Sequence, residues 1–125
     1  MLFDFLLVAA GGAVGSMARY GAGLATQGWH HSFPLGTFIV NIVGSLVIGL
    51  VAGWIAADAH PETHHQMRLL LAVGLCGGFT TFSSFSLETF TLLRGGQGMV
   101  ALGYIALSVL LCLGATAIGY ALTHR

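Results

Sequence analysis

Four long apolar runs, separated by three short polar segments, divide the chain. The runs cover about residues 3–26, 35–57, 68–93 and 98–122. A hydrocarbon core of roughly 30 Å requires about 20 consecutive apolar residues in a helix, and each run is long enough. The short connections leave no room for a further soluble domain. The pattern therefore predicts an all-α membrane protein whose four transmembrane helices form one domain over residues 1–125.

Polar residues inside two of these runs recur at helical spacing, which places them on single faces. The second run carries Thr37, Asn41 and Ser45, and the fourth carries Tyr104, Ser108, Cys112, Thr116 and Tyr120. Because polar groups are costly in lipid, such faces turn toward the protein interior or toward water. Hydrogen bonding between helices is the alternative explanation, favoured for a single serine. Asn41 is predicted to line a pore, because its amide carries two donor hydrogens.

Small residues recur at the same spacing and predict close helix packing. Gly11 and Gly15 lie four residues apart in the first run, and Ser45, Gly49 and Gly53 form a similar ladder in the second. The two cysteines, Cys76 and Cys112, lie inside predicted spans and are interpreted as small packing residues.

The third run contains the segment LCGGFTTFSSFS, residues 75–86. Consecutive glycines weaken a helix by roughly 1 kcal/mol each relative to alanine, so a break is predicted near Gly77 and Gly78. A glycine pair that serves only close packing is the alternative. A helix broken at membrane depth must be buried or line a cavity, and its freed carbonyls can bind cations. Beyond the glycines, Phe82 and Phe85 share one face, and Glu88 lies a turn further on.

Composition agrees with a membrane location, since 56% of the residues are hydrophobic and 6% are charged. Arg19 and Arg94 fall on one side of the predicted bundle and Arg68 and Arg125 on the other, and the chain has no lysine. The positive-inside rule then favours neither orientation. The balance predicts dual topology, with two oppositely inserted copies paired about a two-fold axis in the membrane plane. The alternative is that other features of the chain fix one orientation.

Proton-coupled export of cations usually needs a carboxylate inside the membrane, and none lies in the middle of a predicted span. Asp4 is terminal, Asp58 and Glu62 are expected in a loop, and Glu88 lies toward the end of its helix. No nucleophile and base, phosphate-binding loop or zinc-ligand spacing indicates an enzyme. The residues therefore predict a small pore or carrier for a neutral or anionic solute.

Three segments, one in each of the first three runs, resemble the CrcB/Fluc family of fluoride channels. They are GGAVGSMARY (11–20), GTFIVNIVGSLVIG (36–49) and GLCGGFTTFSSFS (74–86). The resemblance covers nearly the whole chain and implies passive export of fluoride by an antiparallel, dual-topology homodimer in the bacterial inner membrane. It also implies a structural sodium ion at the dimer interface, bound by the backbone carbonyls of Gly77 and Thr80.

The resemblance also implies a fluoride pathway. Phe82 and Phe85 would contact fluoride through their ring edges, and Asn41 would be the pore amide. The other implied positions are Tyr104 and Ser108 on the fourth helix, Thr37 in the vestibule, Arg19 at an entrance, and Thr81, Ser84 and Glu88 along a polar track. Cys112 departs from the family pattern, in which a serine is expected.

The expected partners are fluoride, a second copy of the chain and the lipid bilayer, with no nucleic acid. Two alternatives stay open. A dual-topology multidrug exporter would need a carboxylate within the first span, and that span has none after Asp4. In a non-transporting packing subunit, the polar stripes would only join helices.

Overall fold

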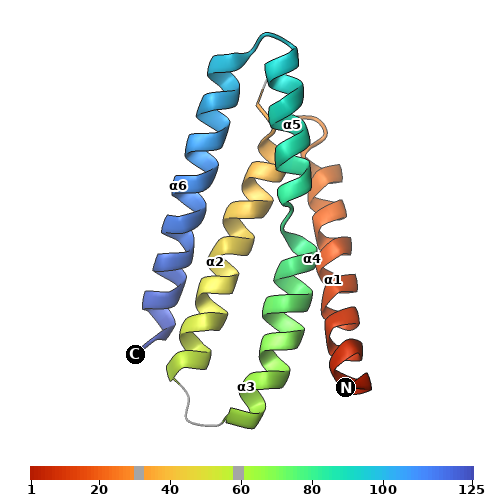
Figure 1. Ribbon diagram of the computed structural model, residues 1–125, viewed down its shortest axis with the longest axis vertical. Helices are drawn as coiled ribbons and strands as arrows, with labels where there is room; N and C mark the ends of the chain where they lie inside the picture. Colours follow the sequence, from red (N-terminus) through yellow and green to blue (C-terminus); the bar gives the residue numbers. More distant parts are fainter. Residues whose placement is uncertain (30–32, 58–60) are drawn as a thin grey trace.

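The computed structural model describes residues 1–29, 33–57 and 61–125, which form an up-and-down bundle of helices (Figure 1). The helices are α1 (Leu2–Thr26), α2 (Leu35–Ala57), α3 (Pro61–Met67), the π-helix η1 (Arg68–Cys76), α4 (Gly77–Phe79), α5 (Phe82–Arg94) and α6 (Gly98–Thr123). Both termini lie at the same end of the bundle as α3, and the connection between α5 and α6 lies at the opposite end (Figure 1).

Four helical segments are long and apolar enough to cross a membrane, which confirms the predicted architecture of the single chain. They are Leu2–Thr26, Leu35–Ala57, His64–Arg94 and Gly98–Thr123. The predicted loop before the third span is wrong in part, because α3 already begins at Pro61 and includes Glu62. Proline suits the first helical position, where its missing N–H would have no helical partner. Asp58, expected in the same loop, lies outside the described residues.

The third span is broken as predicted, but three residues later than expected. Gly77 and Gly78 are helical, whereas Thr80 (φ −80°, ψ 159°) and Thr81 (φ −151°, ψ 112°) are extended. A Cβ atom at Gly78 would lie 2.6 Å from the carbonyl oxygen of Gly12. Gly78 therefore allows close packing of α4 on α1, which was the alternative interpretation of the glycine pair.

The predicted glycine seams are confirmed. A Cβ atom at Gly11 would overlap the carbonyl oxygen of Leu70 in η1, and one at Gly49 would overlap that of Thr116 in α6. Across the second seam, Thr116 Oγ1 donates to Ser45 O at 3.0 Å. Part of the fourth polar stripe therefore joins α6 to α2, as in the hydrogen-bonding alternative.

The π-helix η1 was not predicted. Its backbone is wound more widely than an α-helix, with hydrogen bonds from residue i+5 to residue i. A Cβ atom at Gly74 in η1 would lie 2.9 Å from the Cα atom of Gly11, so the two helices are in backbone contact here. The 3.6-residue period used to assign faces does not hold along this part of the third span.

Candidate functional site

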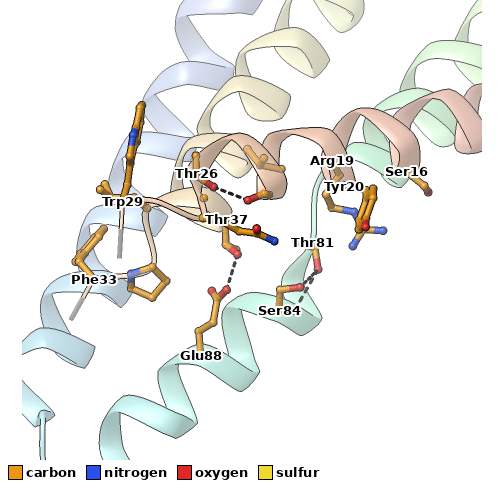
Figure 2. Close-up of a pocket in the computed structure, with 16 residues that line it drawn as sticks. Ser16, Arg19, Tyr20, Thr26, Trp29, Phe33, Thr37, Thr81, Ser84 and Glu88 are labelled. Carbon is orange, nitrogen blue, oxygen red and sulfur yellow. Dashed lines mark hydrogen bonds between the residues drawn. The ribbon is translucent and has the colours of Figure 1, made fainter. Parts of the chain in front are cut away.

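Two cavities lie on either side of the break in the third span, and Thr81 lines both. The first cavity, of about 570 Å³, lies between α1, α2 and α5 (Figure 2). The second cavity, of about 400 Å³, lies between α2, η1, α5 and α6. All the predicted pathway positions except Tyr104 line one or both of these spaces.

The first cavity contains a carboxylate whose two oxygens are both hydrogen-bonded. Thr37 Oγ1 donates to Glu88 Oε1 at 2.6 Å, and Tyr104 OH donates to Glu88 Oε2 at 2.7 Å. Arg19 projects from α1 into the same cavity, away from Glu88 in Figure 2. The cavity thus has a cation, Arg19, near one wall and, at another, a carboxylate that accepts hydrogen bonds from two hydroxyls.

Thr81 forms the cap of α5 at the point where the third span resumes its helical course. Its Oγ1 accepts a hydrogen bond from Ser84 N at 3.1 Å and donates to Ser84 Oγ at 3.1 Å. A side-chain oxygen at this position satisfies one of the N–H groups that the first turn of a helix leaves without a helical partner. The hydroxyl of Thr81 is therefore occupied by helix capping.

Asn41 holds the break open from the neighbouring helix α2. Its Oδ1 accepts from Thr81 N at 2.8 Å, and its Nδ2 donates to Thr81 O at 3.1 Å. The side-chain amide thus replaces, at one residue, the backbone hydrogen bonds that the broken helix loses. Because an amide nitrogen carries two hydrogens, one donor of Asn41 remains.

The second cavity brings together Asn41, Phe82, Phe85 and Ser108, four of the residues predicted for the pathway. The ring centroids of Phe82 and Phe85 are 5.5 Å apart, and Phe82 is 79% exposed in the single chain. Ser108 is only 7% exposed, and its side chain makes no hydrogen bond within the described part of the chain. Within the described residues, the Ser108 hydroxyl therefore keeps its hydrogen-bonding capacity and lines the same cavity as the two aromatic rings.

Tyr104 lines neither cavity. It is fully buried, with its ring centroid 5.1 Å from that of Phe85 and 5.3 Å from that of Phe33. Sequence reasoning missed the link from Thr37 and Tyr104 to Glu88. The sequence feature that could have predicted this link is a single carboxylate in the third span, Glu88, with hydroxyl residues in the spans on either side of it in the chain.

The residues implied for sodium fit a cation with oxygen ligands. The helical partner of Gly77 O would be Thr81 N, which donates to Asn41 instead, and Thr80 is extended. Both Gly77 and Thr80 line the second cavity, and Gly77 is exposed in the single chain. Carbonyl oxygens are suitable ligands for a hard cation. Within residues 1–29, 33–57 and 61–125, no group of three His, Cys, Asp or Glu side chains offers a different kind of metal site.

Four spanning helices, one of them broken at membrane depth between two cavities, define a small multi-pass membrane protein. Residues 6–120 match the sequence profile of a family described as "CrcB-like protein, Camphor Resistance (CrcB)", and the chain belongs to this CrcB family. A protein of Hyphomonas neptunium named "Fluoride-specific ion channel FluC" is 49% identical over 122 residues, covering 97% of this chain and 95% of that protein. A protein of the same name from Desulfotalea psychrophila is 44% identical over 124 residues, covering 99% and 94%. These relatives are named as channels, in agreement with the prediction that the chain is not an enzyme.

Proposed function

We propose that this protein is a fluoride-selective ion channel that lets cytoplasmic fluoride leave the cell down its electrochemical gradient. The observation that carries the proposal is the convergence of Asn41, Phe82, Phe85 and Ser108 on one cavity beside the broken helix. The names of the bacterial relatives support fluoride as the permeating ion.

The cavity chemistry suits a small anion that must shed its water. Fluoride holds water tightly, so a narrow pathway has to replace that shell with short contacts. The remaining donor of Asn41, the hydroxyl of Ser108 and the positive edges of Phe82 and Phe85 supply such contacts without a fixed charge. Chloride is larger and would meet the same groups at unfavourable distances.

The first cavity serves as the vestibule. Arg19 raises the local concentration of anions at its mouth, because positive charge in a low-dielectric cleft attracts them. Thr37, Thr81, Ser84 and Glu88 continue the polar track toward the break. Glu88 is an acceptor for two hydroxyls, so its role is to orient Thr37 and, through the core, Tyr104.

The functional unit is an antiparallel homodimer with a sodium ion at its centre. Balanced arginines favour both orientations, and the exposed faces of Phe82 and Gly77 leave the second cavity incomplete without a second copy. Carbonyls of Gly77 and Thr80 from the two copies would hold the sodium, which supplies positive charge at the interface. A reporter fused after Arg125 that is accessible from only one side of the membrane would contradict dual topology.

The proposed location is the bacterial inner membrane. Hydrogen fluoride crosses membranes as a neutral molecule and releases fluoride in a less acidic cytoplasm. A passive channel then allows the membrane potential, worth about 2.3 kcal/mol per charge per 100 mV, to drive the anion outward.

The test is fluoride efflux from potassium-loaded liposomes after addition of valinomycin, followed with a fluoride electrode. Wild-type protein should release fluoride rapidly and retain chloride. Phe82→Ile should slow the efflux by about tenfold or more, which corresponds to a barrier raised by ~1.4 kcal/mol. Phe90→Ile is the matched control, because Phe90 lies on the same helix, is 57% exposed and lines neither cavity of the proposed pathway.

Absence of fluoride flux from folded protein would overturn the channel proposal and favour a packing subunit. Flux of an organic cation driven by a proton gradient would favour the exporter. Equal slowing by Phe82→Ile and Phe90→Ile would remove Phe82 from the pathway.

A further inference from the structure

Three aromatic rings lie in a row that leads from the first cavity to the second. Phe33 lines the first cavity, Phe85 lines the second, and Tyr104 is fully buried between them. The ring centroid of Tyr104 is 5.3 Å from that of Phe33 and 5.1 Å from that of Phe85. Aromatic pairs attract one another at centroid distances of about 4.5–7 Å. One core residue therefore connects a ring of the first cavity with a ring of the proposed fluoride pathway.

The ring of Phe33 is held in place although this residue precedes a helix. Pro34 O accepts a hydrogen bond from Phe38 N at 3.1 Å, so Pro34 caps α2 and Phe33 lies just before the cap. The rings of Phe33 and Phe38 meet edge to face, at 5.1 Å and 86°. Packing between these two positions is the hydrophobic staple that fixes the entry of a chain into a helix. The staple does not require the second edge-to-face contact of Phe33, at 81° to the ring of Tyr104.

Tyr104 is the buried neighbour against which the ring of Phe85 packs. The other ring contact of Phe85 in the described chain is with Phe82, which is 79% exposed. Tyr104 is fixed at both ends, because its hydroxyl donates to Glu88 at 2.7 Å and its ring contacts Phe33. An aromatic ring attracts an anion through its positive edge, so the tilt of the Phe85 ring decides how well it can contact fluoride. The packing of Tyr104 therefore sets a property of the second cavity.

We infer that Phe33 is a positioning residue of the anion pathway, which fixes the ring of Tyr104 and, through Tyr104, the tilt of the Phe85 ring. Phe33 acts in this way without lining the second cavity. The inference deepens the proposed function and rests on it, because it takes Phe85 to contact fluoride. Removal of the Phe33 ring should therefore slow the passage of fluoride through each open channel.

The test is the fluoride current of single channels in planar bilayers that contain the reconstituted full-length protein. Loss of the hydrophobic staple alone would reduce the number of folded channels and leave the current of each open channel, the unit current, unchanged. Phe33→Leu keeps an apolar side chain but removes the ring. Its unit current should fall by about threefold to tenfold, equivalent to ~0.6–1.4 kcal/mol on the barrier. Phe33→Tyr keeps the ring and should retain the wild-type unit current within about twofold.

Trp29→Leu is the matched control for the wall of the first cavity. Trp29 lines this cavity together with Phe33 (Figure 2), but it makes no ring contact in the described chain. Its unit current should stay within about twofold of wild type. An equal fall in Trp29→Leu and Phe33→Leu would overturn the inference, because the effect would then arise in the first cavity itself.

A double substitution tests the route through Tyr104. If Phe33 acts only on that ring, Phe33→Leu combined with Tyr104→Leu should conduct no worse than Tyr104→Leu alone. Losses of unit current that multiply in the double variant would overturn the route.

Failure of this inference is distinguishable from failure of the proposed function. Absence of fluoride current in the wild type would overturn the channel, whereas a wild-type current that Phe33→Leu leaves unchanged would overturn only the inference. The ring contact is measured without any flux by NMR of protein labelled in its three tyrosine rings. The signals that disappear in Tyr104→Phe belong to Tyr104, and Phe33→Leu should shift them while Trp29→Leu should not. Unshifted Tyr104 signals in Phe33→Leu would overturn the inference even if Tyr104→Leu prevents folding.

Discussion

Asn41→Ala should destabilise the protein by removing the side chain that pairs with the broken third span. Its amide makes two hydrogen bonds to Thr81, at 2.8 Å and 3.1 Å, and Thr81 is only 7% exposed. Without the amide, the N–H and C=O of Thr81 lose their partners at a buried position. The substitution therefore acts on the backbone of a different helix, not on Asn41 alone.

The magnitude follows from the two groups that would be left unpaired. A buried polar group without a partner costs about 1–3 kcal/mol, which gives ~2–6 kcal/mol for the pair. Hydrogen bonds between membrane helices average about 0.6 kcal/mol and reach about 1.7, because the unfolded chain in the membrane also finds partners. The expected loss in the free energy of unfolding is therefore ~1–4 kcal/mol. A loss near 4 kcal/mol is expected if water does not reach the unpaired N–H and C=O of Thr81.

The assay is reversible unfolding in mixed detergent micelles, followed by circular dichroism, with fluoride efflux measured on the same preparations. Ser45→Ala is the matched control, because Ser45 lies on the same stripe of α2 and its hydroxyl makes no hydrogen bond in the described chain. Asn41→Ala should lose stability and flux together, whereas Ser45→Ala should stay within about 0.5 kcal/mol of wild type. An Asn41→Ala protein as stable as the control would refute the role of Asn41 at the break, even if its flux were lost.

Two further substitutions test the core around the cavities. Tyr104→Phe keeps the buried ring but removes the hydroxyl that donates to Glu88, so the free energy of unfolding should fall by about 0.6–1.7 kcal/mol, the range for hydrogen bonds between membrane helices. Unchanged stability in detergent unfolding would contradict this reading of Glu88. Gly49→Ala forces a methyl group against the backbone of Thr116 and should cost about 1–3 kcal/mol, measured in the same way. Gly21→Ala is its control, because nothing lies within 4 Å of a Cβ atom there, and equal losses from the two glycines would contradict the close-packed seam.

The sequence allowed the four spans and the glycine seams to be predicted because both depend on local residue type. The length of an apolar run decides whether a helix can span the membrane. Only glycine leaves room for the backbone contact between Gly49 and Thr116. The existence of the break was predictable for the same reason. Its position was not, because Thr81 is held extended by Asn41, which lies 40 residues away along the chain.

The candidate site was predictable as a set of residues but not as a set of contacts. Helical spacing placed Thr37 and Asn41 on one face, yet Thr37 binds a carboxylate and Asn41 binds backbone. The spacing also placed Tyr104 with Ser108, although Tyr104 is buried among aromatic rings and only Ser108 lines a cavity. The one-dimensional pattern cannot distinguish these neighbours, because it contains no information about which side chain of the facing helix is within reach.

The unused donors, more than the polar stripes themselves, indicate where an anion can be bound. Thr37 and Tyr104 donate to Glu88, and Thr81 donates to Ser84, so these three hydroxyl hydrogens are already engaged. The Ser84 hydroxyl only accepts in that contact, so its hydrogen has no partner among the described residues and is available in the first cavity. One amide hydrogen of Asn41 remains at the break.

Ser108 has a hydroxyl with no hydrogen-bond partner among the described residues, and it lines the second cavity together with Phe82 and Phe85. On the proposed pathway, the free donors would therefore lie in the first cavity, at the break and in the second cavity, which is the order in which a dehydrating anion would need them. The same group of polar residues can therefore both join the helices and serve the proposed anion pathway. The hydroxyl hydrogens of Thr37, Thr81 and Tyr104 are already donated within the protein. Among the described residues, Ser84, Asn41 and Ser108 each keep a hydrogen that an anion could accept.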